Sequence, residues 1–407
     1  MRDRLPRAEF FSEHHRKLAQ RVIQRVAVIA GEASGDQLGG DLIAALRARH
    51  PGVEVLGMAG PRMRAAGCRA LASIDELAVM GLVEVLKHYP RLHTLRRRLT
   101  AELLAARPDV LVGIDVPDFT LEIERQARAA GVPAVHYVCP QVWAWRAGRL
   151  PKIRQSTDLI LTLFPFEVPF LAGHGIAAEF VGHPLADRIP LEPDRSAARR
   201  AVLPGSDGAP LVALMPGSRR QELARHVGLF VRAASELSRL RPDARYAIGA
   251  VDDASAAFIR DQLVANDGGV PVDIVVGRAT ELLSAADAAL LASGTVTLEA
   301  ALCGTPSVVA YRLATPSYWL MRRAVKVPHV ALPNLLLGER LMPEFLQDAA
   351  TPAALARALQ AWLDEPARVA GFRARCAELH RSLRVGNGIA AASALERLLE
   401  RRGGSGR

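Results

Sequence analysis

The stretch 211–222, LVALMPGSRRQE, constrains the fold more than any other part of this chain. Its first four residues form a short apolar run typical of a buried strand. A Pro-Gly-Ser turn follows at 216–218, and residues 219–240 continue with helical spacing. A strand, a tight turn and a helix N-terminus form an anion site, because free backbone N–H groups and the positive helix end face the turn. Arg219 adds a permanent charge there. Phosphate binding is one interpretation, and an ordinary turn of a parallel sheet is the other.

A second glycine turn follows the apolar run 288–291. It begins with Ser293, Gly294 and Thr295 and opens a helix that Gly304 ends. Small donors at a helix start again suit a phosphate. Glu299 lies in the first turns of this helix, where it can accept hydrogen bonds from ribose hydroxyls or serve as a capping-box partner.

Apolar runs alternate with helical spacing along both halves of the chain. Strands are predicted at 25–30, 53–58, 109–114, 134–138 and 159–163, and then at 211–214, 244–250, 272–276, 288–291 and 307–311. This alternation predicts an α/β protein with two doubly wound, Rossmann-like domains facing across a cleft. The predicted parts are a charged extension at 1–24, a first domain at 25–188, a Pro/Gly-rich linker at 189–210, a second domain at 211–365, and C-terminal helices with a flexible tail at 366–407.

Candidate functional residues in the first half follow its strands. The turn GEASGD at 31–36 lacks the spacing of the dinucleotide fingerprint, although its glycines allow close approach of a ligand. Asp115 and Asp118 follow the strand at 109–114, at the sheet edge where ligands bind in open α/β folds. Asp118 suits an N-cap of the next helix. Asp115 is left without a structural role.

The composition limits the classes of molecule that the protein is expected to bind. The 407 residues carry a net charge of +10, which favours phosphorylated substrates or anionic lipid, and no nucleic-acid-binding motif is visible. Four scattered cysteines without metal-ligand spacing suit reduced thiols in the cytosol. No secretory signal or membrane-spanning run is expected. Residues 77–99 place an apolar face beside several arginines, which suits either an interfacial membrane contact or a helix packed on its own sheet.

Several stretches together resemble the bacterial lipid-A-disaccharide synthase family. The matching pieces, in order, are GEASGD (31–36), AGPRM (59–63), ELAVMGLVEVL (76–86), VGIDVPDF (112–119), HYVCPQVWAWR (136–146), PFE (165–167), GHPLAD (182–187), MPGSR with Glu222, ASGTVTLE (292–299) and LPNLL (332–336). The joint occurrence of ELAVMG, VGIDVPDF and VWAWR is specific. Cys139 and Gln141 depart from the serines usual in the family.

The resemblance implies a GT-B glycosyltransferase at the inner face of the cytoplasmic membrane. It would join UDP-2,3-diacylglucosamine to 2,3-diacylglucosamine 1-phosphate, form a β-1′,6 disaccharide and release UDP. It implies no cofactor, a homodimer formed through the C-terminal segment, and a peripheral location at the inner membrane.

The resemblance also assigns roles to residues. Asp115 matches the proposed general base, and Arg219 and Asn334 match residues implicated in activity, with Asn334 expected on a loop that projects into the cleft. The remaining matched positions are divided between donor, acceptor and membrane. The donor set is Gly217, Ser218, Arg219, Glu222, Ser293, Gly294, Thr295, Thr297 and Glu299. The acceptor set is Ser34, Gly35, Asp36, His136 and His183. The membrane or acyl set is Val79, Met80, Leu82, Val83 and Leu86.

An α-linked sugar nucleotide that gives a β-glycoside requires inversion, and therefore one in-line displacement. The reaction needs one base for the acceptor hydroxyl and stabilisation of the departing diphosphate. Asp115 ranks first as the base, followed by His183 and then His136, whose ordinary pKa values lie nearer neutrality. The two glycine turns and Arg219 can replace a divalent metal, so metal independence is predicted. A sugar-nucleotide epimerase of similar fold and a non-catalytic lipid-binding protein are the alternatives.

Overall fold

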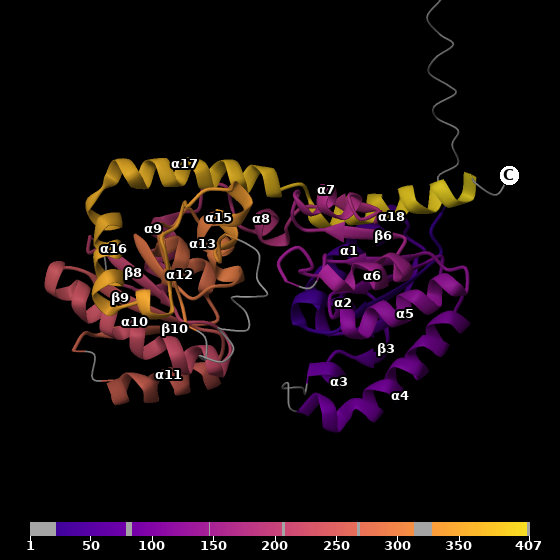
Figure 1. The fold of residues 1–407 in the computed structure, drawn as a ribbon, viewed down its shortest axis with the longest axis horizontal. Coiled ribbons are helices and arrows are strands. Elements are labelled where there is room, and N and C mark those ends of the chain that lie inside the picture. The colour runs from indigo at the N-terminus through magenta and orange to yellow at the C-terminus, as the bar shows by residue number, and fades with distance from the viewer. Residues whose placement is uncertain are drawn as a thin grey trace, which may run out of the picture.

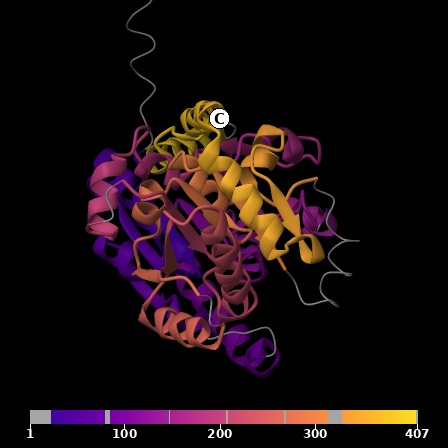
Figure 2. The same cartoon turned by 90° about the vertical axis from the view of Figure 1, so that its left-hand side faces the viewer.

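The computed structural model describes residues 22–404 except 79–83, 146, 206–207, 267–268 and 313–327. These residues form two α/β lobes that lie side by side (Figure 1). In the view turned by 90°, the second lobe lies in front of the first (Figure 2). The predicted fold class, two doubly wound sheets with flanking helices, is confirmed.

The first lobe contains a seven-stranded parallel sheet in the order β3-β2-β1-β4-β5-β6-β7. Its strands are β1 (Arg25–Ala30), β2 (Glu54–Ala59), β3 (Arg69–Ser73), β4 (Val110–Ile114), β5 (Ala134–Tyr137), β6 (Leu159–Thr162) and β7 (Ala178–Phe180). Its helices are α1 (Ala33–Arg49), α2 (Pro61–Ala65), α3 (Asp75–Ala78), α4 (Glu84–Ala105), α5 (Pro117–Ala129), α6 (Leu150–Ser156), α7 (Glu167–Ala172) and α8 (Pro184–Arg188), with a 3-10 turn at Ala147–Arg149.

The second lobe contains a six-stranded parallel sheet in the order β10-β9-β8-β11-β12-β13. Its strands are β8 (Leu211–Met215), β9 (Arg245–Ala250), β10 (Val272–Val276), β11 (Ala288–Leu291), β12 (Ser307–Tyr311) and β13 (Glu344–Leu346). Its helices are α9 (Arg195–Val202), α10 (Arg220–Leu240), α11 (Asp253–Asn266), α12 (Ala279–Ala285), α13 (Thr295–Leu302), α15 (Leu332–Leu337), α16 (Pro352–Asp364) and α17 (Pro366–Leu383), with a 3-10 turn at Gln347–Ala349.

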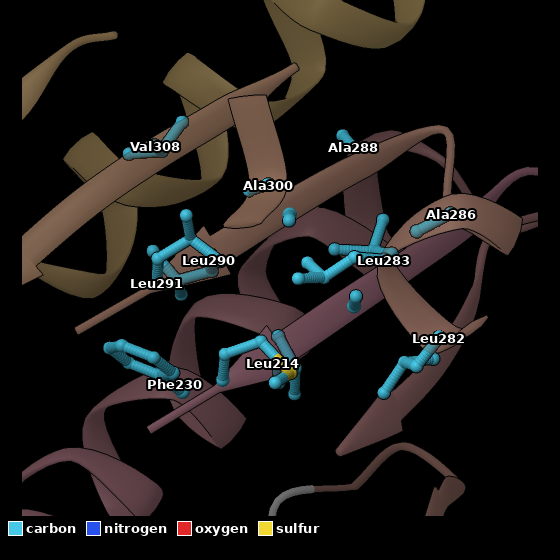
Figure 3. Packing of buried hydrophobic residues seen from close by; sticks show 14 of the residues in the cluster. Leu214, Phe230, Leu282, Leu283, Ala286, Ala288, Leu290, Leu291, Ala300 and Val308 are labelled. Carbon is cyan, nitrogen blue, oxygen red and sulfur yellow. The ribbon is translucent and has the colours of Figure 1, made fainter. Parts of the chain in front are cut away.

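Apolar strands give each lobe its core. Every residue of β8 and β11 is buried, as expected for strands covered by helices on both faces. In the second lobe, the buried cluster includes Leu214 of β8, Phe230 of α10 and Leu283 of α12 (Figure 3). Strands β8 and β11 pair in parallel, so their carboxyl ends lie side by side, where both glycine turns begin.

Three aspartates, each directly before one strand, accept hydrogen bonds from the backbone N–H groups at the start of the neighbouring strand. Asp109 accepts from the N–H groups of Gln24 and Arg25, Asp158 from Ala134, and Asp287 from Leu211. The backbone N–H of each aspartate bonds back to the neighbouring strand. Each pair of bonds satisfies buried backbone groups and sets the register of the two strands.

Two predicted segment boundaries differ in the structure. Residue Ile23, assigned to the charged extension, is buried in the core of the first lobe. The linker at 189–210 contains helix α9, whose Arg195 and Arg199 both pair with Asp287 of the second lobe. A Pro/Gly-rich composition does not reveal such ion pairs, because they depend on contacts distant in sequence.

The last helix, α18 (Asn387–Gly404), returns to the first lobe, as Figure 1 shows. It packs against α1, and its Arg397 and Arg401 pair with Glu179. The buried amide of Asn387 accepts from the Tyr137 hydroxyl at 2.6 Å and donates to the carbonyl of Gly182 at 2.8 Å. The chain between α17 and α18 therefore joins the lobes a second time, in addition to the connection after α8.

Candidate functional site

A pocket of about 540 Å³ opens at the carboxyl ends of the first-lobe strands and reaches the second lobe. Asp115, Glu167 and His183 line it from the first lobe, and Thr295 and Leu332 line it from the second. The crevice between the strand ends of two such lobes is the expected ligand site in this class of fold. The two lobes thus contribute side chains to one cavity.

Asp115 lies on a strained turn at the end of β4. Its φ is 52°, and that of Val116 is 44°, which is an unusual left-handed conformation for a β-branched residue. The Asp115 N–H donates to the Tyr137 carbonyl at 2.9 Å, and the Val116 N–H donates to Asp115 Oδ1 at 2.8 Å. A Cβ at Gly31 would lie 2.4 Å from Val116 Cγ2, so the turn requires glycine at that position. Strain of this kind often accompanies functional residues.

The surroundings of Asp115 oppose its ionisation. Burial is the main cause of a raised pKa, and the neighbouring Glu32 carboxyl raises the pKa further by its charge and by a hydrogen bond. The Val116 N–H and the charge of His136 lower it. A carboxyl with a raised pKa in a cleft has the properties of a general base, because it binds a proton more readily than an ordinary aspartate.

The two histidines ranked below Asp115 are both buried, but only one lines the pocket. His183 Nδ1 accepts from the Leu185 N–H at 3.2 Å, which leaves the ring proton on Nε2 of the neutral side chain. Burial lowers the pKa of His183 to about 4. At neutral pH His183 is therefore a hydrogen-bond donor toward the pocket, and this arrangement argues against its role as a base. His136 is fully buried and bonds through Nδ1 to Glu124, so it does not line the cavity.

Some residues of the first glycine turn line the pocket, and Asp36 instead stabilises the fold. Ser34 and Gly35 line the pocket, and the Ser34 hydroxyl donates to Glu32. Asp36 is 2% exposed and accepts from the N–H groups of Gly60, Arg62 and Met63. Its carboxylate caps helix α2 and ties it to α1, so this predicted acceptor residue acts within the fold.

In the second lobe, Glu222 fills the turn that was predicted to hold an anion. Its Oε2 accepts from the N–H groups of Ser218 and Arg219 at 3.0 and 3.2 Å, and a Cβ at Gly217 would lie 2.5 Å from the same atom. These two donors were expected to face a ligand, and that expectation is corrected because the glutamate already binds them. The Arg219 side chain is 82% exposed and bonds to Glu222 Oε1 at 3.3 Å.

The adjacent turn after β11 is more open. Gly294 has a φ of 144°, with no atom within 4 Å of a Cβ at that position, and Thr295 lines the pocket. Ser293 and Thr297 act within the fold, since Ser293 donates to the Val330 carbonyl and Thr297 accepts from the Leu332 N–H. Burial raises the pKa of Glu299, which accepts from the Thr280 hydroxyl.

Asn334 does not project into the cleft. It lies in helix α15, where a loop was predicted, and is fully buried. Its amide donates to the Met342 carbonyl and to Glu344, both at 2.8 Å, and accepts from the Met342 N–H. Both amide protons are used in the fold, so Asn334 holds the segment that carries Leu332 into the pocket.

Most of the predicted membrane residues lie outside the described part of the chain. These are Val79, Met80, Leu82 and Val83, and the side chain of Leu86 is likewise not described. Farther along α4, Leu95, Leu99 and Leu103 are buried on the sheet, while Arg91, Arg97 and Arg98 are exposed. The described part of α4 therefore packs on its own sheet with an arginine-rich outer face. Within the described ranges, no helix has the length and apolarity to cross a membrane.

Sequence reasoning missed several pocket residues as site candidates, among them Glu32, Trp143 and Glu167. Trp143 Nε1–H donates to Glu167 Oε1 at 3.0 Å, and the Phe164 N–H donates to Oε2 at 3.2 Å. Glu32 lies in the first glycine turn, and Glu167 directly follows the buried β6 and its Pro-Phe turn, so position after a strand was the available signal. In the described residues, no cluster of three or more histidine, cysteine, aspartate or glutamate side chains has the arrangement of a metal site. Asp118, predicted as an N-cap, instead pairs with Arg149 in the exposed first turn of α5.

Sequence comparisons identify close relatives over nearly the whole chain. The model of the lipid-A-disaccharide synthetase family matches residues 26–396. The lipid-A-disaccharide synthase of Alkalilimnicola ehrlichii is 52% identical over 373 residues, which are 91% of this chain and 98% of that protein. The enzyme of the same name from Pseudomonas aeruginosa is 48% identical over 378 residues, which are 93% of this chain and 99% of that protein.

Solved structures of similar fold are distant in sequence. A UDP-GlcNAc 2-epimerase from Neisseria meningitidis bound to UDP-GlcNAc aligns with a TM-score of 0.60 at 12% identity, over 93% of this chain and 99% of that one. The calicheamicin glycosyltransferase aligns with a TM-score of 0.57 at 18% identity, with the same coverage. Both likenesses concern the two-lobed fold.

The burial of Glu167 predicts a pH-dependent contribution to stability. Desolvation raises its pKa from 4.5 to about 7. In the unfolded chain the carboxyl ionises at the lower value, so its bound proton stabilises the fold below about pH 4.5, and this stabilisation is lost as the pH rises through 7. We expect Glu167→Gln to gain stability relative to the unchanged protein between pH 5 and pH 8, by about 3 kcal/mol.

Chemical denaturation at both pH values measures this difference. Glu400→Gln, at an exposed position of α18, controls for the loss of one carboxyl group. A stability difference that is equal at pH 5 and pH 8 contradicts the prediction.

Proposed function

The chain belongs to the lipid-A-disaccharide synthase family of glycosyltransferases, and we propose that it joins UDP-2,3-diacylglucosamine to 2,3-diacylglucosamine 1-phosphate. The products are the β-1′,6-linked disaccharide 1-phosphate and UDP. The observation that carries the proposal is the shared pocket, in which Asp115 of the first lobe and Thr295 of the second line one cavity. A transferase of this kind needs its base and its donor site to face one another across a cleft.

In the proposed reaction, Asp115 removes the proton of the acceptor 6-hydroxyl. The hydroxyl oxygen attacks the anomeric carbon, the bond from that carbon to the diphosphate oxygen breaks, and UDP leaves with the electron pair. The raised pKa of Asp115 supports this role, since the carboxyl then holds the proton more firmly in the transition state. Neutral His183, with Nε2–H as its remaining donor, suits a hydrogen bond to a sugar hydroxyl.

The diphosphate is assigned to the second lobe. Arg219 is exposed at the end of β8, and the open Gly294 turn begins α13 after the neighbouring β11. A guanidinium group and a helix N-terminus both stabilise developing negative charge. Glu299, which is partly buried in α13, is the candidate for the ribose hydroxyls.

One assay tests the proposed function against its alternatives. UDP release is measured from the diacylated sugar nucleotide, with and without 2,3-diacylglucosamine 1-phosphate. The proposed synthase releases UDP only with the acceptor and forms the disaccharide. Conversion of the UDP-sugar without any acceptor favours an epimerase, and absence of UDP release under both conditions favours a lipid-binding protein.

Substitutions at Asp115 and Arg219 should affect different quantities, turnover in the first case and UDP affinity in the second. Asp115→Ala removes the base, so kcat should fall by about 10²- to 10⁴-fold while UDP affinity is retained. Arg219→Ala removes a charged contact to the diphosphate, so UDP affinity should fall by about ten- to a hundredfold. Calorimetric titration with UDP and steady-state turnover measure the two quantities. Equal loss of turnover and UDP affinity in Asp115→Ala would remove that residue from the role of base, and unchanged affinity in Arg219→Ala would contradict the diphosphate assignment.

The acylated substrates also favour peripheral binding to the inner face of the inner membrane. The exposed arginines of α4 suit an anionic lipid surface, and the apolar residues before them supply the second signal that stable attachment requires. Replacement of Val79, Leu82 and Val83 by serine should weaken co-sedimentation with anionic vesicles while the reaction with detergent-dispersed substrates persists. Unchanged co-sedimentation would contradict the proposed contact. A homodimer is proposed on the family resemblance alone.

A further inference from the structure

Two of the described arginines line the pocket and have no part in the mechanism above. Arg149 is the last residue of the 3-10 turn before α6, and Arg188 is the last residue of α8. The carboxyl groups of Glu32, Asp115 and Glu167 line the same cavity. A substrate that brings a further anion into this cavity needs a positive group beside it, because an unpaired charge is costly in a partly desolvated site. The two arginines are the candidates for that group.

Arg149 is held close to the turn that carries Asp115. Its Nη2 donates to both carboxylate oxygens of Asp118, at 2.7 and 2.8 Å, and Asp118 lies three residues after Asp115. The residues that follow Arg149 anchor it, since Leu150 and Ile153 of α6 are buried in one cluster with a side chain of α5. The guanidinium group is therefore fixed beside the proposed base by the core of the lobe.

The ion pair leaves Arg149 able to bind a second anion. The side chain of Asp118 is 74% exposed and that of Arg149 is 26% exposed, and such surface pairs add little to stability. Both bonds come from Nη2, so Nε and Nη1 lie outside this ion pair. A guanidinium group has several N–H donors in one plane, which suits the bidentate binding of phosphate oxygens. Arg149 can thus bind a phosphate while Asp118 stays in place.

The two arginines belong to opposite faces of the sheet. Helices α4 and α5 are buried together with Ile29 of β1, whereas α1 and α18 are buried with Val28 on the other face. Helix α6 packs against α5, so Arg149 lies on the face that carries α4. Arg188 pairs with Asp41 of α1, on the opposite face.

We propose that Arg149 binds the 1-phosphate of the acceptor sugar and so selects a phosphorylated acceptor. The inference rests on the proposed function. In this acceptor, the carbon that bears the reacting hydroxymethyl group and the carbon that bears the phosphate both flank the ring oxygen. The hydroxyl and the phosphate therefore lie within one sugar width of each other, and Asp115 and Arg149 lie on neighbouring turns of the pocket.

The position of α4 supports the same assignment. Its exposed arginines are proposed to contact an anionic lipid surface, and they lie on the face of the sheet to which Arg149 belongs. An acceptor anchored in that surface by its acyl chains keeps its phosphate at the level of the lipid headgroups. Arg149 thus meets the phosphate on the side from which the acceptor arrives.

Equilibrium binding in detergent micelles tests the assignment with two ligands, 2,3-diacylglucosamine 1-phosphate and 2,3-diacylglucosamine. Arg149→Gln should weaken binding of the phosphorylated sugar by about ten- to a hundredfold, because a hydrogen bond between two charged groups is lost. Binding of the dephosphorylated sugar and the KM of the sugar nucleotide should not change. Lys152→Gln is the matched control, since Lys152 is exposed on α6 and does not line the pocket.

Two further variants separate phosphate binding from a structural role of the ion pair. Asp118→Asn breaks the same ion pair but leaves the guanidinium group in place, so the preference for the phosphorylated sugar should persist. Arg149→Lys retains the positive charge and should keep part of this preference. Equal loss of the preference in Arg149→Gln and Asp118→Asn overturns the proposal. Loss of the preference in Arg188→Gln, with none in Arg149→Gln, also overturns it, because the phosphate then lies at the opposite face.

Co-sedimentation with anionic vesicles distinguishes the acceptor phosphate from a phospholipid headgroup. Arg149→Gln should sediment as the unchanged protein does. Weaker co-sedimentation together with an unchanged sugar preference assigns Arg149 to a headgroup and overturns the proposal.

The two proposals fail separately. If the unchanged protein forms no disaccharide, the proposed function is wrong whatever the sugar preference. If the disaccharide forms and Arg149→Gln keeps the full preference for the phosphorylated sugar, the proposed function stands and the phosphate assignment is wrong.

Discussion

The contact between Gly31 and Val116 determines the chemistry of the pocket. The turn after β1 and the turn after β4 approach so closely that no side chain fits at Gly31. This approach brings Glu32 beside Asp115 and holds Asp115 and Val116 in left-handed conformations. Burial is the main cause of the raised pKa of Asp115, and the negative charge of the neighbouring Glu32 raises that pKa further. The close approach of the two turns thus contributes to the electrostatics of Asp115.

The register of the sheets places that contact at the edge of the cleft. Asp109 fixes the start of β1 and Asp158 fixes the start of β5, and each lies directly before the adjacent strand. Because these strands are parallel and begin together, their carboxyl ends also come together. A slip of one residue would move Asp115 to the opposite face of the sheet. The second lobe uses Asp287 in the same way, which aligns the two glycine turns.

Sequence patterns predicted the central strands and the edge strand β10, but they missed the other edge strands. Buried strands such as β8 and β11 consist of continuous apolar runs, which define them without any tertiary information. The missed strands β3, β7 and β13 are edge strands, and β7 and β13 have only three residues each, so none of them produces such a run. Asp115 was predicted as a site residue because its carboxylate follows a buried strand and has no evident structural role in the sequence, and it lines the pocket. The buried positions of Asn334 and Asp36 could not be predicted, because the backbone groups that their side chains bind lie elsewhere in the sequence.

The sequence pattern also misleads about the turn after β8, to which the diphosphate of the donor was assigned. A strand–turn–helix pattern predicts free backbone N–H groups at 217–219, yet Glu222 binds those of Ser218 and Arg219. A diphosphate at this turn must therefore displace a carboxylate, or it must bind through the Arg219 side chain and the open turn at Gly294. The second arrangement leaves Glu222 as the helix cap and avoids exposing its charge to the phosphate. It also places the leaving group next to Thr295, which is the point where the second lobe reaches the pocket of Asp115.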